Sequence, residues 1–476
     1  MVVQHNMQAA NANRMLNVTT GQQAKSTEKL SSGYRINRAA DDAAGLSISE
    51  KMRKQIRGLD KASSNAEDGV SSVQTAEGAL TEVHSMLQRM NELATQSANG
   101  TNSTTDRSAI QDEISQLTTE IDRVAETTKF NETYLLKGGD GTKLEYMKGH
   151  DAGLKGALTD GTTTATFKVA AGALDEGKSV TIGGKDYTIG SAVADVQGAV
   201  DKLTTAGDKV TVNDKTYTYV AKDSAAPGGQ TVTKAGWVLD GDKASTEGIA
   251  LTIANGDKVT TTTKAGASAS YTAAEMDNGV SKADPSIISA EKAVSLMKDE
   301  LIAANKVGVT NGTVEITGNP AYDKDNGVTF NINKGSAEVA NKLSFSLHVG
   351  SDADMTNKIT VGIETMNSSY LGIKGLNVND DSGIAGTYAI DAISDALQKV
   401  SDQRSSLGAV QNRLEHTIDN LDNVVENTTS AESRIRDTDM AKEMVNYSKN
   451  NILAQAGQSM LAQANQSNQG VLSLLQ

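Results

Sequence analysis

The sequence predicts a mainly α protein, in which a long helical-bundle or coiled-coil rod is built from both chain ends and carries short β-hairpins and an inserted α+β variable region. Over residues 52–94, apolar residues recur only at steps of three and four, the spacing of a helix seam. No proline interrupts that run, whereas all three prolines, Pro227, Pro285 and Pro320, lie in the middle of the chain. A helix over residues 43–99 would be about 85 Å long, and no compact domain needs such a rod for itself. The seam therefore predicts partner helices.

Composition narrows the class of protein. The 476-residue chain has a formal net charge of −14 with interspersed charges, which argues against nucleic-acid binding. The absence of cysteine excludes disulfides, thiol chemistry and a cysteine metal site. No stretch approaches the roughly 20 apolar residues of a membrane span, so no membrane insertion is expected. The N-terminal residues do not form a Sec-type signal, which fits a cytoplasmic protein or one exported without a cleaved signal.

Residues 1–42 read as a thin helical arm with few apolar positions, among them Leu16 and Leu30. Burial of so few side chains, at about 1.5–3 kcal/mol each, does not order an isolated helix. We expect this arm to be disordered alone and helical in an assembly. Asp41 or Asp42 is then the expected N-cap of the long helix.

The long helix and its successor form a predicted helical hairpin. The rod seam on the long helix comprises Met52, Ile56, Leu59, Val70, Val73, Leu80, Val83 and Leu87. Asn99 and Gly100 make a turn, and Thr104, Thr105 or Asp106 is expected to cap a second helix. The apolar stripe of that helix runs from Ile110 to Val124 and predicts packing against the rod.

The middle of the chain, residues 141–342, has a different composition and a period of two. Strand pairs are predicted over residues 180–189 and 210–220, with helices at 193–203 and 285–305. A further hairpin is predicted from residues 343–349 and 359–363. This region is therefore an α+β insertion.

Helical spacing returns in the last part of the chain. The returning seam includes Leu397, Leu407, Leu414 and Leu421, and a final helix over 438–476 carries Met444, Ile452, Met460, Leu461, Leu472 and Leu475. The order of elements brings the two ends together. It predicts terminal arms at 1–42 and 434–476, a rod domain from 43–140 and 343–433, and a surface-exposed insertion at 141–342.

The sequence contains no recognisable catalytic motif. The five histidines are scattered, and neither a His-Glu-x-x-His motif nor a phosphate-binding glycine loop is present. We expect no enzyme activity, no catalytic or metal site and no cofactor.

Several blocks at both ends resemble bacterial flagellin. They are LSSGYRINRAADDAAG (30–45), EGALTEVHSMLQRMNELATQSANGTNS (77–103), EIDRVAETTKFN (120–131), LGAVQNRLEHTIDNL (407–421), AESRIRDTDMAKEM (431–444), LAQANQ (461–466) and VLSLL (471–475). The resemblance covers residues 1–140 and 343–476. It implies a structural subunit that polymerises into the extracellular flagellar filament for swimming motility, with terminal helices innermost and the middle region projecting.

The resemblance also implies partners: copies of the chain itself, the filament cap, hook-associated proteins, an export chaperone and the flagellar type III export apparatus. Two alternatives stay open, a hook–filament junction protein and a secreted coiled-coil adhesin. The Thr- and Ser-rich middle could accept O-linked sugars or form plain solvated loops.

The resemblance further implies recognition by the vertebrate flagellin-sensing Toll-like receptor. The matching positions are Gln88, Arg89, Leu93, Gln96, Ile110 and Glu113. Asn91 and Leu117 depart from the pattern, because many recognised flagellins have Arg there. In the segment that resembles the ligand of cytosolic inflammasome sensors, Gln476 replaces the usual terminal Arg.

Overall fold

The computed structural model describes residues 6–242, 247–380 and 382–473 of the chain. Two compact units share these residues. Unit 1 comprises Met1–Gln74, Phe345–Val361 and Leu407–Gln476, and unit 2 comprises Thr75–Ser344 and Gly362–Ser406. Two long helices, α2 (Ala43–Ser97) and α7 (Ile384–Arg436), contribute to both units. The predicted combination of long helices at both ends with a β-rich centre is confirmed.

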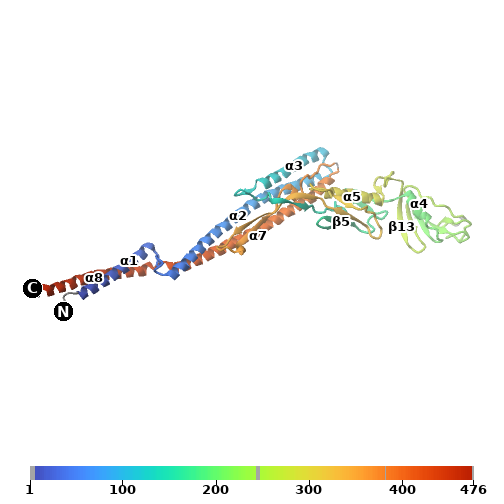
Figure 1. Cartoon of the computed structure of the whole chain (residues 1–476). Coiled ribbons are helices and arrows are strands. Elements are labelled where there is room, and N and C mark those ends of the chain that lie inside the picture. The colour runs from blue at the N-terminus through green and yellow to red at the C-terminus, as the bar shows by residue number, and fades with distance from the viewer. Residues whose placement is uncertain (1–5, 243–246, 381, 474–476) are drawn as a thin grey trace. The chain divides into compact units, whose positions relative to one another are not determined.

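Unit 1 holds the first and last helices, α1 (Met7–Ser32) and α8 (Met440–Ser473), which lie side by side (Figure 1). The Asn6 side chain caps α1 by accepting a 2.9 Å hydrogen bond from the Ala9 N–H. Gly33 ends the helix at a φ of 78°, a left-handed conformation that favours glycine. The thin N-terminal arm is therefore a single helix paired with the C-terminal one.

A short link joins α1 to α2 and is tied to the α7–α8 junction. The Arg35 N–H donates to the Arg436 carbonyl at 2.7 Å, and the Thr438 N–H donates to the Gly33 carbonyl at 2.9 Å. The Asp42 carboxylate then accepts from the Gly45 N–H at 2.8 Å. This confirms the prediction that one of the two aspartates caps α2.

The seam packs α2 against α7 within unit 1. Leu59 and Ala62 contact Leu421 and Val425. Further along, Ala66 packs in one cluster with Leu414 and with residues of the two-stranded sheet of β20 (Leu343–His348) and β21 (Lys358–Ile363). A short 3₁₀ helix, η1 (Met355–Asn357), precedes β21. The predicted hairpin over residues 343–363 is confirmed.

Burial follows the predicted seam. The buried members are Leu59, Val73, Leu80, Val83, Leu87, Leu407, Leu414 and Leu421, and the half-buried members are Met52, Ile56, Val70 and Leu397. An apolar stripe with a polar opposite face is what a period near 3.5 predicts.

In unit 2, α3 (Thr104–Thr127) follows α2 after a short turn. Its N-cap is Ser103, one residue before the predicted candidates, because the Ser103 hydroxyl accepts from the Asp106 N–H while the Asp106 carboxylate accepts from the Ser103 N–H. This reciprocal capping box satisfies two otherwise unpaired donors. The predicted capping by Thr104, Thr105 or Asp106 was therefore wrong by one position.

The β-rich part of unit 2 contains three larger sheets, confirming the predicted strand pairs. The four-stranded sheet has the order β17 (Glu315–Thr317), β18 (Val328–Asn333), β5 (Thr164–Val169) and β4 (Ala157–Asp160). The five-stranded sheet has the order β14 (Met276–Asp277), β15 (Val280–Ser281), β16 (Ile287–Ile288), β7 (Lys185–Ile189) and β6 (Ser179–Ile182). The six-stranded sheet has the order β11 (Gly236–Leu239), β10 (Lys215–Val220), β9 (Lys209–Val212), β12 (Lys258–Thr262), β13 (Ser268–Ala274) and β8 (Ser191–Ala192).

Two small sheets and three helices complete unit 2. β1 (Lys129–Phe130) pairs with β2 (Thr133–Tyr134), and β3 (Gly139–Tyr146) pairs with β19 (Ser336–Asn341). The helices are α4 (Val193–Asp201), α5 (Ala290–Asn305) and α6 (Ser368–Leu371). The predicted helix over 285–305 begins only at residue 290, because Ile287 and Ile288 form β16 and the Ser289 hydroxyl caps α5.

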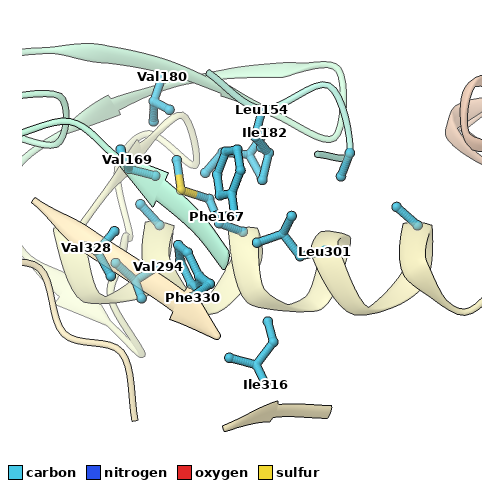
Figure 2. Close-up of a cluster of buried hydrophobic side chains, with 14 of the residues drawn as sticks. Leu154, Phe167, Val169, Val180, Ile182, Val294, Leu301, Ile316, Val328 and Phe330 are labelled. Carbon is cyan, nitrogen blue, oxygen red and sulfur yellow. The ribbon is translucent and has the colours of Figure 1, made fainter. Parts of the chain in front are cut away.

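The main core of the β-rich part is formed by the four-stranded sheet, α5 and strands β6 and β7 of the five-stranded sheet (Figure 2). Phe167 on β5 and Phe330 on β18 are direct cross-strand partners, and their ring centroids are 6.2 Å apart. Val294 and Leu301 reach the same core from α5. Two of the four phenylalanines in this aromatic-poor chain therefore build one packing site.

Candidate functional site

The α1–α8 pair carries nine exposed large apolar side chains. We call this set the terminal apolar surface; it consists of Met7, Met15, Val18, Met440, Met444, Val445, Ile452, Leu453 and Met460. Ile452 is 67% exposed and Met460 is 65% exposed. Exposed large apolar side chains gathered on one helix pair mark a candidate interaction surface.

The two helices meet through small and polar residues. Ala454 is buried, and a Cβ on Gly457 would lie 3.4 Å from Cδ1 of Leu16. The Asn6 amide donates to the Ala464 carbonyl at 3.3 Å. The small side chains let the helices approach closely, whereas most large apolar side chains point outward.

Two hollows cut into the terminal apolar surface. A groove of about 680 Å³ is lined by residues of both helices, including Met15 and Met460. A second hollow of about 450 Å³ is lined by residues of α8, including Met444, Ile452 and Leu453. The terminal apolar surface is therefore not flat, and side chains of another molecule can fit into its hollows.

The predicted terminal positions divide by exposure. Met444, Ile452 and Met460 are exposed, whereas Leu16, Leu30 and Leu461 are half-buried. The side chain of Leu472 and the whole of Leu475 lie outside the described residues.

A second candidate surface lies on α2 and α3 in unit 2. The Arg89 guanidinium donates to Glu113 at 2.9 Å and to Glu92 at 3.1 Å. The hydrogen bond to Glu113, followed by that to Glu92, raises the pKa of Arg89 above its ordinary value. Gln88 and Gln96 are exposed on the same helix as Arg89.

The other two predicted receptor positions lie inside unit 2. Leu93 is 2% exposed and Ile110 is 6% exposed. The structure therefore brings Arg89 and Glu113 together on the surface and assigns Leu93 and Ile110 to packing.

Sequence reasoning missed Arg107, which is 3% exposed. Its guanidinium donates to the carbonyls of Ser97 at 3.0 Å and Asn99 at 3.3 Å, at the C-terminal end of α2. It also donates to the carbonyl of Asp380 at 3.1 Å. The available signal was the placement of a cation in the first turn of α3, where the helix dipole disfavours positive charge. Such an arginine needs partners elsewhere in the fold.

A segment after α6 is held against α2 and α3 by polar side chains. The Gln111 amide donates to the Leu376 carbonyl at 2.9 Å, and its oxygen accepts from the Val378 N–H at 2.7 Å. The Ser97 hydroxyl donates to the Val378 carbonyl at 2.8 Å. These bonds fix the α2–α3 turn that supports the surface around Arg89.

Among the described residues, no three or more His, Asp or Glu side chains are grouped to hold a metal ion. Within the same residues, no helix combines the length and the apolar character that crossing a bilayer requires.

Comparisons with known proteins agree with the two-ended resemblance. Family models described as "Bacterial flagellin N-terminal helical region" and "Bacterial flagellin C-terminal helical region" match residues 3–140 and 390–475. A flagellin of Clostridium tyrobutyricum is 40% identical over 473 residues, which cover 98% of this chain and 100% of that relative. A flagellin of Bacillus subtilis (strain 168) is 34% identical over 477 residues and 100% of both chains. The solved structure described as "3D structure of FliC from Burkholderia pseudomallei" is 20% identical, with 72% of this chain and 99% of that chain covered and a TM-score of 0.28.

Long helices at both ends and exposed apolar side chains on the terminal helix pair are typical of a structural protein that associates with other protein chains. With a full-length relative at 40% identity, the chain belongs to the bacterial flagellin family. It is a non-enzymatic structural subunit of the extracellular flagellar filament, it self-polymerises, and it serves motility.

Proposed function

We propose that the chain polymerises by burying its terminal apolar surface against neighbouring copies, with residues 1–42 and 434–476 as the arms that make this contact. The observation that carries the proposal is the set of large apolar side chains, such as Ile452 and Met460, that a single chain leaves exposed. Burying each of them would contribute about 1.5–3 kcal/mol. Many copies can supply contacts that one chain lacks.

The same proposal assigns a role to each remaining part of the chain. Residues 43–140 and 343–433 form a coiled-coil rod domain, and residues 141–342 form a variable, surface-exposed insertion. The packing of Leu59 and Ala62 against Leu421 supports the pairing of the two long helices. Their seam positions follow a period near 3.5, which favours a supercoil.

Family membership supports further partners. The chain is exported through the flagellar type III apparatus with the help of an export chaperone, and it assembles beneath a filament cap and onto hook-associated proteins. The alternative of a hook–filament junction protein predicts the same terminal helices without indefinite polymerisation. A secreted adhesin would tolerate trimming of both ends.

Seeded elongation tests the assembly proposal and separates it from these alternatives. Purified subunits added to filament fragments should extend them, whereas chains lacking residues 1–42 or 434–476 should stay monomeric and soluble. Leu59→Asp should also abolish filaments, because it puts a charge into the seam. Elongation by either truncated chain would overturn the role assigned to the arms.

A second function is favoured by the exposed pair of Arg89 and Glu113. We propose that Gln88, Arg89, Gln96 and Glu113 contact the vertebrate flagellin-sensing Toll-like receptor. The buried side chains of Leu93 and Ile110 support this surface by holding α2 against α3. An arginine already oriented by two carboxylates loses little side-chain freedom on binding. Such residues are common binding hot spots.

Affinity for the receptor ectodomain tests this contact. Arg89→Ala should weaken binding by about tenfold or more, which corresponds to about 1.4 kcal/mol. Arg123→Ala is the matched control, because Arg123 is also exposed on this unit and paired with a neighbouring glutamate, Glu120. Equal affinities for Arg89→Ala and the unaltered chain would contradict the proposal.

A further inference from the structure

The exposed methionines of this chain are concentrated on its terminal helices. The sequence contains 14 methionines and no cysteine, so thioethers are its only sulfur groups. Within the described residues, six methionines are exposed: Met7, Met15, Met440, Met444, Met460 and Met355. The first five lie on α1 and α8, and only Met355 lies elsewhere, on η1. Met90, Met297 and Met366, in contrast, are at most 1% exposed.

Five of the nine residues of the terminal apolar surface are methionines. Met15 and Met460 line the groove between the helices, and Met444 lines the hollow on α8. Methionine is flexible and polarisable, so it adapts to irregular gaps between packed helices. The same thioether is also the side chain in this surface that two-electron oxidants attack.

We propose that the five methionines of α1 and α8 form an oxidation-sensitive modification site that controls assembly. A peroxide transfers one oxygen atom to the thioether sulfur: the O–O bond breaks, an S–O bond forms, and hydrogen peroxide is reduced to water. The sulfur is oxidised to a sulfoxide with no net uptake or release of protons. Each modified side chain changes from apolar to polar at a position that assembly would bury.

The free subunit and the filament then differ in sensitivity. A sulfoxide buried against an apolar neighbour leaves its oxygen without a hydrogen-bond donor, which is unfavourable. Oxidised free subunits therefore do not add to a filament, whereas the assembled filament shields the same sulfurs. Methionine sulfoxide reductases reverse the change, one enzyme for each sulfoxide epimer. This inference rests on the proposed mode of assembly.

Peroxide treatment followed by seeded elongation tests the inference. Free subunits are treated with hydrogen peroxide, the peroxide is removed, and sulfoxide at each methionine is measured by peptide mass spectrometry. Treated subunits should lose most of their elongation, and treatment with both reductases should restore it. In a variant with leucine at all five positions, the ratio of elongation after treatment to elongation before it should stay near one, whatever its starting rate, because the five exposed thioethers are gone. Met355→Leu is the control and should remain as sensitive as the unaltered chain.

The outcomes separate this inference from the proposed function. Failure of untreated subunits to elongate would count against the assembly mode. In that case the mass spectra still decide the inference, because the five methionines must oxidise faster in free subunits than Met90 and Met297. Equal elongation by treated and untreated subunits would overturn it. The inference would also be overturned if treatment stopped elongation of the leucine variant as well and the reductases did not restore elongation of the treated subunits.

Discussion

Replacing Arg107 by alanine should weaken the junction of α2 and α3 selectively. The guanidinium is almost fully buried and donates to the carbonyls of Ser97, Asp380 and Asn99. A hydrogen bond from a charged group contributes about 1.5–3 kcal/mol, so losing the first two alone removes about 3–6 kcal/mol. Alanine supplies no donor to replace them.

Hydrogen exchange measures this loss locally, which suits a chain with more than one compact unit. In Arg107→Ala, the Ala98 and Val378 amides should exchange about 100-fold to 10,000-fold faster, at about 1.4 kcal/mol for each factor of ten. Arg123→Ala should change these amides by no more than about 0.5 kcal/mol, because its ion pair is exposed. Unchanged exchange at Ala98 in Arg107→Ala would refute the reasoning.

Two further predictions concern unit 2 and α7. A Cβ on Gly386 would lie 2.8 Å from the backbone nitrogen of Ala98, so Gly386→Ala should lower the calorimetric stability by about 1–3 kcal/mol. A Cβ on Gly408, on the same helix, meets open space, so Gly408→Ala should raise the stability by up to about 1 kcal/mol. Equal effects of the two substitutions would contradict close packing of α7 at Gly386. Burial raises the pKa of Glu176 above its ordinary 4.5 despite a hydrogen bond from Ser191. The stability that this carboxyl contributes to the folded state is therefore fully present below its unfolded pKa and is lost as the pH rises through its folded pKa. Glu176→Gln should remove that loss from denaturation curves measured across this pH range, and an identical pH dependence in both proteins would refute it.

Periodicity predicted the elements whose stabilising contacts are regular. The apolar steps along α2 and α7 predicted which face is buried, and Leu59, Leu80 and Leu414 lie where the seam requires. Hairpins such as β6–β7 were also predictable, because a Gly-Gly turn separates two short alternating runs. Ile110 belonged both to the predicted α3 stripe and to the predicted receptor contact, and its burial follows the stripe.

Contacts between distant residues were not predictable from local pattern. β9 pairs with β12, and Val212 lies opposite Val259, 47 positions later in the chain, although nothing in either strand specifies the other. The partners of Arg107 likewise come from the end of α2 and from Asp380. Choosing Ser103 over Thr104 as the cap required the backbone geometry, since both residue types favour that position.

Seeded elongation of Ile452→Asp tests the central claim most directly. The substitution removes about 2 kcal/mol of apolar burial per subunit and adds a carboxylate whose desolvation is unfavourable. Ile452→Leu keeps the surface apolar, and Met355→Asp puts the same charge on an exposed apolar residue outside α1 and α8. If the terminal apolar surface drives polymerisation, Ile452→Asp fails to extend filament fragments while both controls extend them. Elongation by Ile452→Asp at the rate of the unaltered chain would contradict the account.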